Sequence, residues 1–153
     1  MKRIVCILTS IILSVSVFCS CGVRKDSTES VARAICEEIE FGGVLYSSLS
    51  GEGDDNYLPS ELLEEMFLSP IPQGTEVTLV IRPSINCAYE VGVFYSPRSK
   101  ERLLILELAR ERLALLNGYY RECKYAVLSR GGYIIYAFCP SADKVSAVLD
   151  SIF

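Results

Sequence analysis

The most reactive side chains in this sequence are thiols. The chain has seven cysteines and no histidine. Beyond residue 21 there are four, an even number that allows three disulfide pairings, namely Cys36, Cys87, Cys123 and Cys139. None has the C-x-x-C spacing, and with no histidine either, the sequence predicts no zinc, haem or other metal or cofactor site. Cys36 and Cys139 lie within or at the ends of apolar segments, which favours separate buried thiols, with disulfides as the alternative.

A serine and a lysine three positions apart are a second candidate for chemistry. Ser141-Ala142-Asp143-Lys144 matches the S-x-x-K motif of penicillin-binding proteins and β-lactamases, in which the serine is the nucleophile. The K-T-G element of those enzymes does not occur, and Ser84-Ile85-Asn86 precedes the serine instead of following it. The chain is also too short for that fold. We therefore interpret Ser141 as a helix N-cap and Lys144 as an exposed side chain.

Carboxylates are the remaining groups for acid–base chemistry, because the commonest general base, histidine, is missing. Glu37, Glu38 and Glu40 lie on one predicted helix, which indicates a solvated face. The acidic loop 47–56 lacks the ligand spacing of an EF-hand, so we predict no calcium site there. No glycine-rich phosphate motif occurs. The sequence thus predicts no catalytic residue and no enzyme, with a hydrolase that uses paired carboxylates as the alternative.

Aromatic and basic side chains suggest binding more than catalysis. The chain has nine tyrosines and no tryptophan. Seven of the tyrosines fall in or near predicted strands or at the end of a predicted helix: Tyr89, Tyr95, Tyr119, Tyr120, Tyr125, Tyr133 and Tyr136. Rings at strand ends usually complete a core, and a groove for a peptide or glycan is the alternative. The arginines of segment 99–116 alternate with glutamates, which favours a salt-bridged face over a phosphate site.

The first twenty residues are typical of a secretory signal peptide. Lys2 and Arg3 precede an apolar run from Ile4 to Phe18, and small or polar residues follow it. The run has fifteen residues, fewer than the roughly 20 that a helix needs to cross a bilayer. Such a segment can be removed by ordinary signal cleavage, removed with lipidation of a cysteine, or kept as an uncleaved anchor. In all three cases the domain that follows is exported.

The end of this segment resembles the lipobox of bacterial lipoproteins. In Phe18-Cys19-Ser20-Cys21-Gly22, Cys21 matches the lipidated cysteine and Ser20 the small residue before it, while Phe18 stands where the family usually has leucine. Cys19 fits less well, because the bulky Phe18 directly precedes it. The resemblance implies a diacylglycerol thioether on Cys21 and an acyl chain such as palmitate on the new amine. It therefore implies a lipid anchor on the extracytoplasmic side of the cell membrane.

The rest of the chain fits one domain. Residues 1–20 form the predicted signal peptide, 21–27 the lipidated cysteine and a short tether, and 28–153 a single extracytoplasmic domain. Removal of the signal peptide leaves 13 basic and 19 acidic residues, a formal charge of −6. This charge argues against a nucleic acid partner, since phosphate backbones bind basic surfaces.

Hydrophobic periodicity predicts an α+β fold. We expect helices that begin at Asp26, Pro59, Ser99 and Ser141, and strands over 76–82, 89–95, 124–129 and 133–139. The helix over 99–116 has its main apolar stripe at Leu103, Leu106, Leu113 and Leu116. The element order is α-α-β-β-α-β-β-α, with a four-stranded, mostly antiparallel sheet and helices packed on both faces.

From about Pro59 to Phe153 the pattern resembles a family of small lipoproteins of clostridial-type Firmicutes that carry an uncharacterised domain. The resemblance lies in Glu90-Val91-Gly92-Val93-Phe94, Glu101-Arg102-Leu103, Ala126-Val127-Leu128, Gly132-Tyr133-Ile134-Ile135-Tyr136 and Ala142-Asp143-Lys144-Val145. It implies a small α+β lipoprotein and no catalytic residue. We expect a binding or interaction module at the outer face of the cytoplasmic membrane, with a membrane-protein or envelope partner. A small solute- or peptide-binding lipoprotein is the alternative.

Overall fold

The computed structural model describes residues 26–83, 88–120 and 123–153. Cys21, the predicted signal peptide, most of the tether and Cys87 lie outside these residues. The elements, in chain order, are α2 (Thr28–Glu38), β1 (Val44–Ser47), α3 (Ser60–Phe67), β2 (Glu76–Pro83), β3 (Ala88–Tyr95), α4 (Ser99–Tyr119), β4 (Tyr125–Arg130), β5 (Tyr133–Phe138), the 3₁₀ turn η1 (Ala142–Lys144) and α5 (Val145–Ile152).

The strands form one antiparallel sheet of five strands in the order β1-β2-β3-β5-β4. The α+β class is confirmed, and the consecutive strands β2–β3 and β4–β5 each pair antiparallel. The prediction of four strands is wrong, because β1 forms between the first two helices and pairs with β2. The four residues of β1 are too short to show an alternating pattern, and the ladder with β2 is what makes them a strand.

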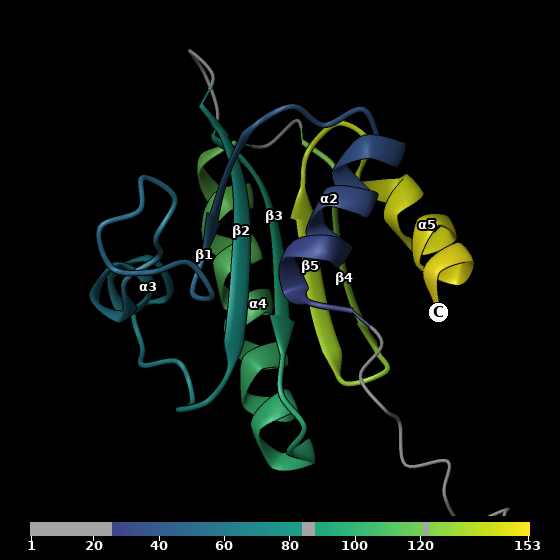
Figure 1. Ribbon diagram of the computed structural model, residues 1–153. Coiled ribbons are helices and arrows are strands. Elements are labelled where there is room, and N and C mark those ends of the chain that lie inside the picture. The colour runs from purple at the N-terminus through teal and green to yellow at the C-terminus, as the bar shows by residue number, and fades with distance from the viewer. Residues whose placement is uncertain (1–25, 84–87, 121–122) are drawn as a thin grey trace, which may run out of the picture.

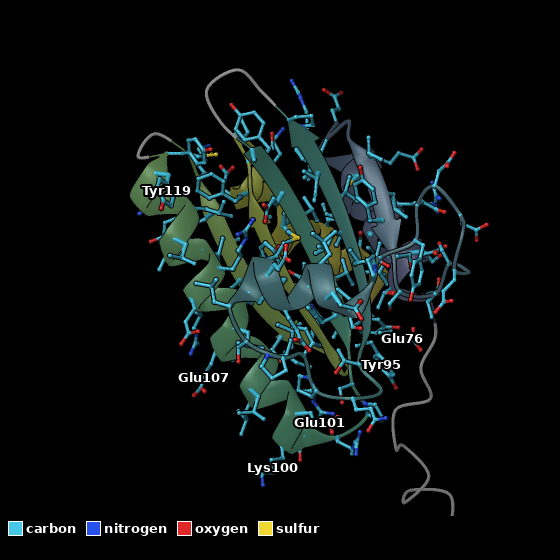
Figure 2. The ribbon with its side chains drawn as sticks, turned by 90° about the vertical axis from the view of Figure 1, so that its left-hand side faces the viewer. Glu76, Tyr95, Lys100, Glu101, Glu107 and Tyr119 are labelled. Atoms are coloured by element: carbon cyan, nitrogen blue, oxygen red, sulfur yellow. The ribbon has the colours of Figure 1, made fainter. Side chains whose placement is uncertain are left out.

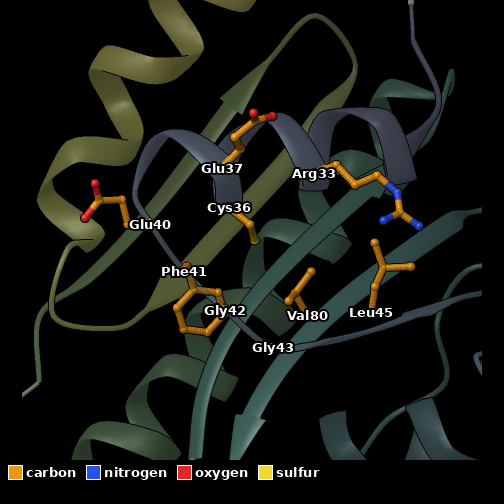
Figure 3. Close-up of a pocket in the computed structure, with 9 residues that line it drawn as sticks. All are labelled: Arg33, Cys36, Glu37, Glu40, Phe41, Gly42, Gly43, Leu45 and Val80. Carbon is orange, nitrogen blue, oxygen red and sulfur yellow. The ribbon is translucent and has the colours of Figure 1, made fainter.

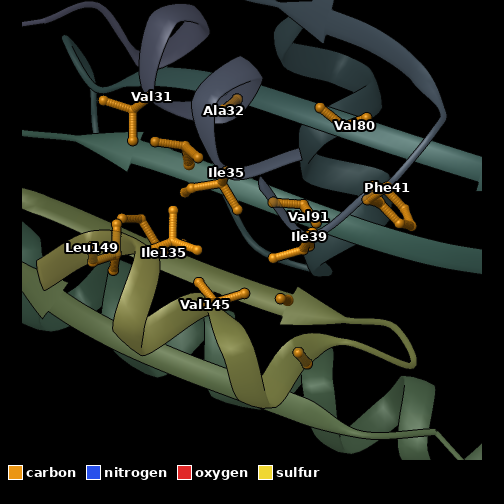
Figure 4. Close-up of a cluster of buried hydrophobic side chains, with 14 of the residues drawn as sticks. Val31, Ala32, Ile35, Ile39, Phe41, Val80, Val91, Ile135, Val145 and Leu149 are labelled. Atoms are coloured by element: carbon orange, nitrogen blue, oxygen red, sulfur yellow. The ribbon is translucent and has the colours of Figure 1, made fainter. Parts of the chain in front are cut away.

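Helices cover both faces of the sheet, as predicted. In Figure 1, α2 and α5 lie on one face and α4 on the other, and α3 packs beside α4. The side chains under α2 and α5 include Ile35, Val91 and Leu149 (Figure 4). All six residues of β5 are buried, alternately in the core of one face and of the other. β5, an interior strand of the sheet, therefore has no polar face, which explains its continuous apolar run.

The ends of two elements follow local chemistry. Ser27, rather than the predicted Asp26, is the N-cap of α2, and its side chain accepts a hydrogen bond from the Ser30 N–H. The β4–β5 turn has φ values of 59° at Gly131 and 94° at Gly132, a conformation that glycine adopts without strain. α2 ends at Glu38, before the glycine pair Gly42-Gly43.

The buried stripe of α4 differs from the predicted one. Its buried residues are Ile105, Leu108, Ala109, Leu113 and Leu116, whereas Leu103 is 65% exposed. The helix also continues through Asn117-Gly118 to Tyr119, and Ser99 is its first residue, not its cap. Leucines occur nearly all round this helix, so their spacing alone admits more than one stripe. In the described part of the chain, no helix is long and apolar enough to cross a membrane.

Candidate functional site

Burial makes Cys36 and Cys139 unsuited to nucleophilic catalysis. Cys36 of α2 is half-buried and Cys139, just after β5, is buried, and both are thiols. Burial, and second the nearby Cys139, raises the pKa of the Cys36 thiol to about 12. Burial also raises the pKa of Cys139. Both groups are therefore protonated at neutral pH and are poor nucleophiles.

The S-x-x-K segment does not form a serine nucleophile site. Ser141 precedes η1, but its side chain makes no capping hydrogen bond, so the predicted N-cap contact is absent. Lys144 is exposed, as predicted. Asp143 between them pairs instead with Lys124 at 2.9 Å, and the hydrogen bond from Lys124 lowers the pKa of Asp143. The segment thus ties η1 to the start of β4.

The tyrosines do not converge on one groove. Tyr133 and Tyr136 are buried on opposite faces of β5. Figure 2 shows Tyr95 and Tyr119 at opposite ends of the molecule, and Tyr119 is 81% exposed. The Tyr133 hydroxyl donates to the carbonyl of Asp26, which holds the start of α2 against the sheet. For Tyr133 and Tyr136, core packing is the role that the structure supports.

The predicted acidic groups are exposed. Glu37, Glu38 and Glu40 lie at or just beyond the end of α2, and the acidic part of the 47–56 loop is in solvent. The described residues hold no group of three or more side chains placed to bind a metal ion. On the outer side of α4, Lys100 and Glu107 point away from the sheet (Figure 2).

A buried ionic cluster, which the sequence analysis missed, lies between the sheet and α4. Glu90 of β3 is 2% exposed and Arg112 of α4 is 18% exposed. Arg112 donates through Nε to Glu90 Oε2 at 3.1 Å and through Nη2 to Glu90 Oε1. The Tyr136 hydroxyl donates to Glu90 Oε2 at 3.0 Å. The carboxylate therefore has three donors, as a buried charge requires.

The surroundings of this cluster raise the pKa values of Tyr136 and Arg112. Burial, and second the charge of Glu90, raises the pKa of Tyr136 well above its ordinary value. Burial lowers the pKa of Arg112, but hydrogen bonding to Glu90 and its charge outweigh that effect, so the pKa is raised overall. Arg112 also donates to the Met66 carbonyl of α3 at 3.1 Å. The cluster thus joins β3, β5, α3 and α4, which is a structural role.

Gly92 makes room for this cluster. It lies opposite Tyr136 in the β3–β5 ladder, and a Cβ at Gly92 would be 2.1 Å from the Tyr136 ring. The ring therefore crosses over the glycine to reach Glu90. A lone glutamate in an otherwise apolar strand is the signal that could have shown a buried partner was needed.

A hollow of about 500 Å³ lies on the other face, between α2 and the edge of the sheet. Its apolar floor is formed by Phe41, Leu45 and Val80. Its rim includes Arg33 and Glu37 of α2 and Glu40, which follows the helix. Figure 3 shows these side chains around the opening. α2 packs on β2 and β3, and the hollow lies beside it, toward β1 at the edge of the sheet.

Two glycines border the hollow. The Phe41 N–H donates to the Cys36 carbonyl at 2.7 Å, which turns the chain back toward the sheet after α2. A Cβ at Gly43 would lie 2.9 Å from the Ile81 carbonyl oxygen, so glycine lets the chain pass close to β2. At Gly42 a Cβ would meet nothing within 4 Å. Gly42 is thus a position where a side chain can be added into open space.

Beside the hollow, β1 presents an open backbone edge. The Ser48 N–H donates to Val77 of β2, whereas the Ser47 N–H points outward to the Asn56 carbonyl. Because the N–H and C=O groups of successive residues in a strand point to opposite sides, those of Leu45, two residues before Ser47, also point outward. Within the described ranges, neither has a backbone partner. Leu45 packs in the core under α2, so its side chain lies on the hollow's face.

The opposite edge of the sheet, β4, is flanked by charge. Lys124 pairs with Asp143 just before the strand, and Arg130 at its end pairs with Asp150 of α5. Charged side chains at an edge strand are a common protection against pairing with another chain. The β1 edge, which adjoins an apolar hollow, is therefore the stronger candidate for binding.

Comparison with known proteins assigns no family. The chain matches no protein-family model, no curated protein and no solved structure. The resemblance to clostridial-type lipoproteins therefore stays a prediction.

Proposed function

We propose that this chain is a lipid-anchored binding module on the extracytoplasmic side of the cell membrane, and that it holds an extended segment of a partner protein along β1. The hollow next to the open edge of β1 is the observation that carries this proposal. In strand addition, backbone hydrogen bonds supply affinity and an adjoining pocket supplies selectivity. Both parts are within reach of one bound segment here.

The hydrogen-bond pattern sets where such a segment lies. A residue opposite Leu45 exchanges two backbone hydrogen bonds with it, and its side chain is on the same face as the Leu45 side chain. That face holds the hollow. At the other end, Ser47 is already bonded to Asn56 and Leu58, so the segment extends from Leu45 toward Gly43.

The predicted anchor restricts the partner. Lipid on Cys21 and a short tether keep the domain near the outer face of the membrane, where membrane proteins and envelope components are the available partners. The formal charge of −6 after removal of the signal peptide disfavours nucleic acid. A binding module is favoured over a hydrolase, because the buried carboxylate of Glu90 is already engaged by Arg112 and Tyr136.

Photocrosslinking tests the proposal in cells. A photoreactive amino acid replaces Gly42 in the full-length, membrane-anchored chain, and a matched control replaces Gly118 of α4, where a Cβ also meets nothing within 4 Å. We expect one defined partner segment to crosslink at position 42 and not at 118. Equal crosslinking at both positions, or none at 42, would contradict a binding site at the hollow.

The anchor has a separate test. Growth with a clickable fatty-acid analogue should label the wild-type chain and leave Cys21→Ala unlabelled. Equal labelling of the two would remove the assignment of Cys21, while the hollow would still be tested by the crosslinking.

A further inference from the structure

We infer that the segment bound at β1 carries a carboxylate that pairs with Arg33, an inference that rests on the proposed function. Arg33 is an exposed residue of α2 that lines the hollow together with Leu45. Figure 3 shows its guanidinium group extending toward the Leu45 side of the opening. A side chain that enters the hollow beside Leu45 therefore meets this cation.

Most other arginines of the described residues have a partner, and Arg110 of α4, which has none, does not line the hollow. Arg98, Arg112 and Arg130 each pair with a carboxylate. Over the residues that the structure describes, no hydrogen bond or ion pair engages Arg33. Its donors are thus available to a ligand at the rim.

The acids nearby leave this cation unneutralised. Glu37 is four residues after Arg33 on the same helix, yet the two form no salt bridge. In Figure 3 the carboxylates of Glu37 and Glu40 point away from the hollow. The planar guanidinium fork matches a carboxylate through two parallel hydrogen bonds, which a neutral side chain cannot reproduce.

The geometry of a strand also determines which position of the bound segment carries the carboxylate. Residues two apart in a strand share one face. A segment with an apolar side chain opposite Leu45 and an acidic side chain two positions away therefore fills the hollow and reaches its rim together. Since Arg33 is exposed, we expect the ion pair to change affinity about threefold, within the range of surface salt bridges.

Panning of a random phage-displayed peptide library tests this inference. The targets are the detergent-solubilised full chain, Arg33→Glu, Arg33→Lys, and Gly42→Phe, which adds a ring at the border of the hollow. Gly118→Phe is the matched control for the added phenylalanine. Thermal unfolding verifies that each exposed substitution leaves the fold intact.

We expect the wild type to enrich peptides with an apolar and an acidic residue two positions apart. Arg33→Glu should enrich basic residues at the second position, Arg33→Lys should keep the acidic preference, and Gly42→Phe should lose these peptides while Gly118→Phe retains them. Peptides that need the open hollow but bind the wild type and Arg33→Glu equally would overturn the role of Arg33 and leave the proposed function standing. Absence of any peptide that depends on the hollow would overturn both.

Discussion

At the scale of single residues, the Glu90–Arg112 pair shows how a charge is kept inside the core. Removing a carboxylate and a guanidinium from water costs several kcal/mol each, and only good geometry offsets this. Here Arg112 contributes two donors and Tyr136 a third, while the Met66 carbonyl accepts another Arg112 N–H. The pair therefore specifies how β3, α3 and α4 fit together more than it adds stability.

Loss of one partner should be much more harmful than loss of both. Arg112→Met leaves the buried Glu90 carboxylate with one donor, and we expect it to lower the free energy of unfolding by about 3–5 kcal/mol. The double variant Glu90→Leu/Arg112→Met should recover most of that loss. Urea unfolding followed by circular dichroism measures both. A double variant as unstable as Arg112→Met would contradict this account of the cluster.

The Cys36 thiol should make stability depend on alkaline pH. Its pKa is about 12 in the folded chain, against an ordinary value of 9.0. A group whose pKa is higher in the folded than in the unfolded state gives its full stabilisation below the unfolded pKa and loses it as pH rises toward the folded pKa. Stability should thus fall above about pH 9. Buried Tyr136, whose pKa is also raised, adds to the same fall.

Replacement of Cys36 isolates its part of this effect. Between about pH 8 and about pH 11, we expect Cys36→Ala to lose about 2 kcal/mol less free energy of unfolding than the wild type does. Unfolding curves at a series of pH values give the two slopes. Parallel pH profiles would show that Cys36 ionises equally in the folded and unfolded states.

At the scale of elements, the sequence was sufficient to recognise a strand or turn wherever its pattern is local. Strands β2 to β5 each have enough apolar or β-branched residues to be recognised, and Gly131-Gly132 marks the turn between the last two. β1 was missed because its four residues become a strand only by pairing with β2, more than thirty positions later in the chain.

The candidate site was less predictable than the fold. Glu90 and Arg112 are 22 positions apart, and nothing local in either segment indicates the other. The hollow is built from α2, the glycine segment after it, β1 and β2, so it depends on the same unrecognised strand. In the sequence, the oppositely charged rim residues Arg33, Glu37 and Glu40 resemble an ordinary solvated helix face. Only the sheet edge beside them shows that they border a hollow.

The buried face of α4 provides a direct test of its rotation. Ile105 is fully buried, whereas Leu103, which the sequence pattern placed in the core, is 65% exposed. We expect Ile105→Ala to cost about 2–5 kcal/mol of unfolding free energy, as buried large-to-small changes do. Leu103→Ala should change it by less than about 0.5 kcal/mol. The reverse order in chemical denaturation would show that α4 is rotated toward the predicted stripe.

At the scale of the whole molecule, α2 connects the predicted anchor to the proposed binding site. Tyr133 holds the carbonyl of Asp26 at the start of this helix, and the hollow lies around its other end. The 11 residues of α2 span about 16 Å, and the six residues Gly22 to Ser27 reach at most about 20 Å when extended. A lipid on Cys21, as predicted, would therefore keep the hollow within roughly 40 Å of the bilayer.

Lengthening the tether should separate anchoring from binding. An insertion of about twenty Gly and Ser residues after Lys25 keeps the lipid and the domain, but it should lower the effective concentration of the hollow near a membrane partner roughly tenfold. Crosslinking from position 42 at limiting partner should fall accordingly, while thermal unfolding stays the same. The same insertion after Gly53, in the exposed loop that follows β1, is the matched control, because it leaves the tether unchanged. If both insertions crosslink as well as the parent chain, the partner does not depend on a short tether, and a soluble envelope component would replace a membrane protein as the expected partner.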